Sequence, residues 1–143
     1  MDEMYDIRDL LKVRRLSYEI WRKELRLEEI RSTLLPKAIT YDGDRVQTSP
    51  EDRMSEVMAK VVDLDAQVKK LRALKARAII TLGDDIDRVD DERCRAVLDA
   101  YYIGGQRMAA IADGLGYSIQ HTYRLRKLGV EKMRRMRKPD VVY

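Results

Sequence analysis

The chain of 143 residues contains no phenylalanine, one cysteine, one histidine and three prolines. The single cysteine, Cys94, excludes an intramolecular disulfide, so a reducing cytoplasm is the natural location. No apolar run approaches the length that spans a membrane, and we expect no signal peptide at the start. Internal repeats of 20–50 residues and low-complexity tracts are also absent from the sequence.

Residues that carry catalysis are equally sparse. His121 is the only histidine, and with Cys94 alone it cannot complete a metal site or a catalytic triad. The acidic run at Asp84, Asp85 and Asp87 is more typical of a solvated connector than of a metal site. No glycine-rich loop that could hold a phosphate occurs. We therefore expect no catalytic residue, no metal, no cofactor and no enzymatic activity.

Charged residues make up 38% of the chain and hydrophobic ones 45%. This balance is too apolar for a disordered chain and, with so few prolines, predicts a mostly helical one. The length suits one domain or two small ones. We expect an all-α fold in which a long antiparallel helical hairpin, residues 1–83, precedes a trihelical helix-turn-helix module, residues 84–143.

The first helix of the hairpin is predicted from Met4 to about Leu35, where Pro36 ends it. Its apolar side chains recur at helical spacing, and a shorter stripe follows. The first stripe comprises Ile7, Leu11, Tyr18, Trp21 and Leu25, and the second Leu27, Ile30 and Leu34. A loop with the turn-forming run 41–44 comes next.

The second helix is predicted to begin at Ser49-Pro50, a capping serine followed by a proline at the first helical position. Its apolar stripe has a heptad-like spacing. Lys75 falls on one position of the stripe, where the neighbouring Leu74 is expected to pack instead, and the helix is expected to end at Gly83. Two stripes of this kind can pack against each other as a hairpin within one chain. They can also form a coiled coil between copies of the chain, so a second copy is an expected partner. The stripe comprises Met54, Val57, Val61, Leu64, Val68, Leu71, Ala78 and Leu82.

The last third of the chain predicts three short helices. An acidic connector, 84–90, leads to a helix capped by Asp90 or Asp91 and ended by Gly104-Gly105. In the segment 107–128, Gly116 suits a tight turn and Ser118 caps the helix that follows. We expect a common core from Val97, Leu98, Tyr101, Tyr102, Met108, Ile111, Leu115, Leu125 and Met133.

Positive charge gathers in the same region. Residues 1–90 sum to −1 and residues 91–143 to +5, and between Ser118 and Lys138 eight basic residues face Glu131 alone. A basic patch on a helix that follows a tight turn is typical of DNA binding in the major groove.

Helical geometry assigns the contacts once Leu125 is placed inward. Arg124 could pair with guanine and Gln120 with adenine, and Ile119 and Tyr123 lie on the same exposed face. Contacts to phosphates are expected from Arg107, Ser118, Arg126 and Lys127. His121 is either a phosphate or base contact or an ordinary surface residue.

The stretch 93–133, RCRAVLDAYYIGGQRMAAIADGLGYSIQHTYRLRKLGVEKM, resembles region 4 of sigma-70-type factors. Shared features are a helix ending in Val-Leu, a tyrosine before a glycine break, and then Ile-Ala, Leu-Gly and Ser. Residues 25–133 are similar in layout to phage-encoded proteins related to the RinA and ArpU type regulators of late transcription. The resemblance implies a double-stranded DNA-binding regulator in a bacterial host, with RNA polymerase as a further partner.

Three residues depart from that pattern. Thr122 stands where such modules usually have valine or isoleucine. Gly114 weakens the first motif helix, and Gly129 either interrupts the second or permits close packing there. Two other classes of function also stay open. One is a DNA packaging protein of the small-terminase type, although its DNA-binding module usually comes first. The other is a helical adaptor that binds a protein partner through the hairpin and binds no DNA.

Overall fold

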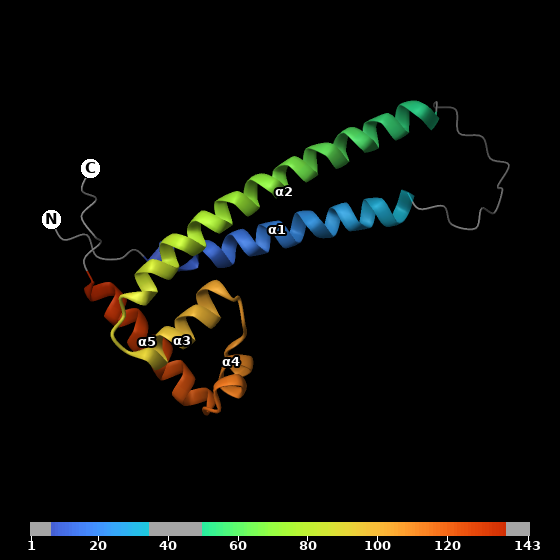
Figure 1. Cartoon of the computed structure of the whole chain (residues 1–143). Helices are drawn as coiled ribbons and strands as arrows, with labels where there is room; N and C mark the ends of the chain where they lie inside the picture. The colour runs from blue at the N-terminus through green and yellow to red at the C-terminus, as the bar shows by residue number, and fades with distance from the viewer. Residues whose placement is uncertain (1–6, 35–49, 137–143) are drawn as a thin grey trace, which may run out of the picture. The chain divides into compact units, whose positions relative to one another are not determined.

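The computed structural model describes residues 7–34 and 50–136, and it is helical with no strand in these two ranges (Figure 1). The all-α prediction is confirmed. None of the helices described is both long and apolar enough to cross a membrane. The helices are α1 Ile7–Leu34, α2 Pro50–Asp87, α3 Glu92–Leu98, the π-helical turn η1 Asp99–Ile103, α4 Met108–Leu115 and α5 Ile119–Arg135.

The chain forms two compact units. One unit is Tyr18–Ala73, and the other combines the chain up to Ser17 with the chain from Leu74 onward. Helix α2 continues through Gly83 to Asp87. The predicted helix end at Gly83 is therefore wrong. The predicted loop after Pro36 and the cap at Ser49 lie outside the described residues.

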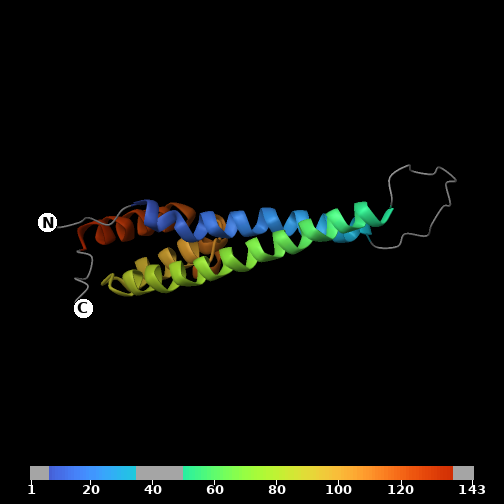
Figure 2. The same ribbon diagram turned by 90° about the horizontal axis from the view of Figure 1, so that it is seen from above.

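In the unit Tyr18–Ala73, α1 and α2 run side by side in opposite directions (Figure 2). Arg31 pairs with Asp65 at 3.1 Å and Arg72 pairs with Glu24, so the residue numbers rise along one helix as they fall along the other. These ion pairs are exposed and contribute little to stability. The stabilising contact is the buried cluster Ile20, Leu27, Val61, Leu64 and Val68.

The buried face of α1 is only partly the predicted one. Tyr18 and Trp21 are 60% and 56% exposed, and Leu25 is exposed as well. The buried residues of α1 are Leu10, Val13 and Ile20, which neither stripe contained, and Leu27, which belongs to the second predicted stripe. Both rows follow the three-and-four spacing of a helical stripe, so periodicity alone could not decide between them.

The stripe of α2 is largely confirmed, since Val61, Leu64, Val68, Ala78 and Leu82 are all buried. Met54 is exposed, and so is Leu74. Lys75, not Leu74, occupies the half-buried position of the stripe. A lysine can do this because its alkyl stem packs on apolar neighbours while the ammonium stays in water.

The second unit has its own core, formed by the start of α1, the end of α2 and the helices α3 to α5. The predicted acidic connector is in large part the last turn of α2. Ile86 and Val89 are fully buried there, and the N–H of Val89 donates to the carbonyl of Ile86 at 2.9 Å. Leu115, expected in this core, is exposed instead. It is the last residue of α4, beside the turn at Gly116.

Helices α3 and α5 pack closely at Gly129. A Cβ at this position would lie 2.9 Å from Cδ1 of Leu98, which is fully buried. Glycine therefore lets the two helices approach here without displacing the side chain of Leu98. Gly114, in α4, differs because a Cβ there would meet nothing within 4 Å.

The two glycines provide a matched test of this packing. We expect Gly129→Ala to destabilise the fold by about 1–3 kcal/mol, because the added methyl displaces Leu98 from a filled core. Gly114→Ala should stabilise it by about 0.5–1 kcal/mol, because it only improves helix propensity. Urea unfolding followed by circular dichroism measures both. Equal effects of the two substitutions would contradict the close contact.

The start of α3 is fixed by Asp91, as predicted. Its carboxylate accepts hydrogen bonds from the backbone N–H groups of Cys94 at 3.3 Å and Arg93 at 2.9 Å. These bonds, that from Cys94 foremost, hold the pKa of Asp91 below its usual value. The charged carboxylate is therefore favoured in the folded state.

Stability should consequently depend on pH through Asp91. Its contribution is complete above the unfolded pKa of about 4 and is lost as pH falls through the lower folded pKa. Asp91→Asn should retain the cap at neutral pH and weaken the loss of stability on acidification, because asparagine caps without titrating. Asp113→Asn, at an exposed position that caps no helix, is the control. Thermal unfolding between pH 7 and pH 2.5 distinguishes the two. An unchanged acid profile in Asp91→Asn would count against this role.

Candidate nucleic-acid interface

The turn between α4 and α5 is built from short-range interactions. Gly116 adopts the left-handed conformation with φ of 73°, and the N–H of Tyr117 donates to the carbonyl of Ala112 at 2.9 Å. The hydroxyl of Ser118 accepts from the N–H of His121 at 3.1 Å and caps α5. The predicted glycine turn and serine cap are both present.

Helix α5 divides into an inner and an outer face. Thr122, Leu125, Gly129 and Met133 are buried. Thr122 carries no penalty there, because its hydroxyl donates to the carbonyl of Ser118 at 2.9 Å. The opposite face is exposed along the first half of the helix, where it presents Ser118, Ile119, Gln120, Tyr123, Arg124 and Lys127.

The carboxylates that the structure describes do not neutralise the exposed cations around this face. No carboxylate among the described residues pairs with Arg107, Arg124 or Lys127. Arg107 does not belong to α5 and stands at the N-cap of α4. Six of the nine predicted contact residues thus lie on α5, five on its exposed face and one, Ser118, at its N-cap. Arg107 lies at the N-cap of the preceding helix.

His121 and Arg126 do not belong to the exposed face of α5. His121 is half-buried, and its ring meets the ring of Tyr117 edge to face at 5.0 Å. Arg126 is half-buried too. Its guanidinium lies 4.4 Å from the ring centre of Tyr101 and 5.3 Å from that of Tyr123.

Arg14 of α1 joins this group, and sequence reasoning missed it. Its guanidinium lies 4.1 Å from the ring centre of Tyr101 and donates to the carbonyl of Tyr101 at 2.7 Å. Tyr101 therefore contacts two arginines from two helices. The residues are 87 positions apart, and no local pattern could have joined them.

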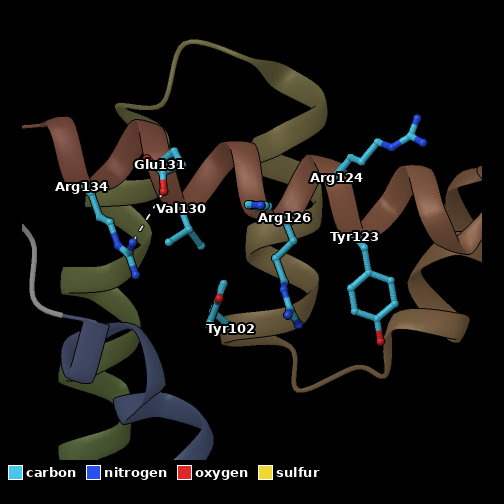
Figure 3. A pocket seen from close by; sticks show the side chains of 8 residues that line it. Tyr102, Tyr123, Arg124, Arg126, Val130, Glu131 and Arg134 are labelled. Atoms are coloured by element: carbon cyan, nitrogen blue, oxygen red, sulfur yellow. Dashed lines mark ion pairs between the residues drawn. The ribbon is translucent and has the colours of Figure 1, made fainter.

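A hollow of about 460 Å³, here called the Tyr102 hollow, opens beside α5 on the side to which Arg126 points (Figure 3). Tyr102 forms one side, and the side chains of Tyr123 and Arg126 extend toward it from α5. Arg124, Lys127 and Arg134 also line it, and Arg134 pairs with Glu131 at 3.6 Å.

Another cation of α5 forms an ion pair within the fold. Lys132 pairs with Asp90 at 2.8 Å. The hydrogen bond between them is the main reason that the pKa of Lys132 is raised and that of Asp90 lowered. Both groups thus remain charged at neutral pH, and Lys132 has a partner within the fold.

Cys94 is buried, and burial raises the pKa of its thiol. A buried thiol of this kind behaves as a small apolar side chain. No group of three or more histidine, cysteine or acidic side chains suited to a metal ion occurs within residues 7–34 and 50–136.

Comparison of the chain with protein-family models, with curated proteins and with solved structures finds no match. The resemblance to sigma region 4 and to phage late regulators accordingly stays a prediction.

Proposed function

We propose that this protein is a sequence-specific double-stranded DNA-binding transcriptional regulator that places the first half of α5 in the major groove. The observation that carries the proposal is the outer face of α5. There Gln120, Arg124 and Lys127 project opposite the buried row, with no carboxylate partner for either cation among the described residues.

The exposed side chains suit distinct roles on DNA. Arg124 can donate two hydrogen bonds to guanine, and Gln120 can pair with adenine in the major groove. Ser118, at the start of α5, and Arg107 suit phosphate contacts, which fix the orientation of a helix without specifying sequence. Lys127 serves the same purpose as a point charge.

In this proposal α3, α4 and α5 act as a trihelical helix-turn-helix module, and the antiparallel segments of α1 and α2 act as a hairpin for assembly. The resemblance noted above adds a phage or prophage setting and contact with RNA polymerase. Support for the module comes from the turn at Gly116 and the cap at Ser118.

An exposed apolar row on α1 supports self-association. Tyr18, Trp21 and Leu25 occupy one helix face, and the rings of Tyr18 and Trp21 lie 5.8 Å apart. A contiguous apolar surface of this kind is typical of an interface. A second copy of the chain would bury it and would supply a second α5 for a two-fold DNA site.

The proposed DNA contact is tested by separating recognition from electrostatic attraction. On a preferred site selected from random duplexes, Arg124→Ala should cost about 1–3 kcal/mol, with much less loss on random DNA. Lys127→Ala should weaken both duplexes similarly. Fluorescence anisotropy at several salt concentrations measures these affinities.

Equal weakening of both duplexes by Arg124→Ala would make Arg124 a phosphate contact and would overturn the proposed orientation of α5. Wild-type protein that binds no duplex at low salt would favour the adaptor function instead.

Self-association is tested by the mass of the full chain in solution. We expect a dimer whose dissociation constant rises at least tenfold in Trp21→Gln, because a large aromatic surface leaves the interface. Ile80→Gln, at a similarly exposed position on α2, should leave it unchanged. Sedimentation equilibrium gives the mass. A monomer would refute the dimer, and a ring of eight or more subunits would favour the packaging function.

A further inference from the structure

The Tyr102 hollow has the charge of an anion site. Four basic residues line it, Arg124, Arg126, Lys127 and Arg134, although the guanidinium of Arg124 points away from Tyr102 (Figure 3), and Glu131 has the one carboxylate that the described residues place in the lining. An apolar ligand would have to desolvate these cations without replacing their hydrogen bonds. A ligand with several anionic oxygens would satisfy them, because both guanidinium and ammonium groups donate to phosphate.

Arg126 is held in place before any ligand arrives. Its guanidinium stacks on Tyr101, whose ring and carbonyl are contacted in turn by Arg14. An arginine fixed in this way loses less side-chain entropy on binding than a free one. Stacking leaves the N–H groups at the edge of the guanidinium available as donors.

The position of the hollow relates it to the outer face of α5. Arg124 and Lys127 belong both to the hollow and to the exposed row. Arg126 and Arg134 are eight residues apart, which corresponds to about 12 Å along a helix. A nucleic-acid backbone that runs beside α5 could therefore place a phosphate in the hollow while the outer face of α5 lies against the bases.

We propose that the Tyr102 hollow is a phosphate-binding site that receives a phosphate of the nucleic-acid backbone, with Tyr101 and Arg14 as positioning residues for Arg126. The DNA origin of this phosphate rests on the proposed function, whereas the phosphate chemistry rests on the hollow itself. Lys132, elsewhere on α5, is paired with Asp90 and contributes nothing comparable.

Neighbouring arginines provide a matched test on DNA. Arg134→Gln and Arg135→Gln remove the same charge from adjacent positions, but only Arg134 lines the hollow. For a random duplex, the slope of log affinity against log salt should become shallower by about one unit in Arg126→Gln and in Arg134→Gln. It should stay unchanged in Arg135→Gln. Equal slopes for Arg134→Gln and Arg135→Gln would overturn the site.

The positioning role is tested at Tyr101. Tyr101→Leu removes the ring beneath Arg126 and should weaken duplex binding about 2- to 5-fold, the range that a cation–π contact accounts for. Tyr101→Phe keeps the ring and should restore wild-type affinity. Equal losses in both variants, or none in either, would remove Tyr101 from the role. Unfolding curves establish that all variants are folded at the assay temperature.

A second probe separates the hollow from the proposed function. Inorganic pyrophosphate titrated into the isotope-labelled full chain should shift the amide NMR signals of Tyr102, Tyr123 and Val130, and Arg126→Gln should abolish the shifts. If the wild type binds no duplex but shows these shifts, the regulator function fails and the site takes a soluble phosphate ligand. If duplex binds but the hollow shows neither the shifts nor the slope changes, the site fails and the function stands.

Discussion

The close contact of Leu98 with Gly129 is the constraint on which the arrangement around α5 depends. Because Gly129 has no side chain, α5 can lie directly against the end of α3. The π-helical turn η1 continues from Leu98, so Tyr101, which contacts Arg126, and Tyr102, which lines the hollow, follow this contact directly in the chain.

Features governed by near neighbours could be predicted from the sequence. The turn at Gly116 and the caps at Asp91 and Ser118 each involve groups within four or five residues, and each occurs where expected. The outer face of α5 followed from one inward residue, Leu125, and the helical repeat. Local physics decides such features, because tertiary contacts change them little.

Features governed by distant partners could not be predicted. The face that α1 buries depends on which of two regularly spaced rows of side chains packs against α2. The row with Ile20 and Leu27 is buried, and the row with Tyr18 and Trp21 is exposed. The buried row presents branched aliphatic side chains, which pack as knobs into the holes of a facing helix. The stack of Arg14 on Tyr101 depends on tertiary packing too, and no spacing along the chain announces it.

The basic residues of α5 do not all call for the same explanation. Cations in the last turn of a helix are stabilising by themselves, because they face the negative end of the helix dipole. Arg135 has that role, and Lys132 has it together with its ion pair to Asp90. Arg124 and Lys127 lie too far from that end to benefit, and no described carboxylate pairs with them. The fold gives no reason for the charge of Arg124 and Lys127, so a ligand with negative charge is the better explanation. Fewer than the eight basic residues counted in the sequence are therefore needed to bind such a ligand.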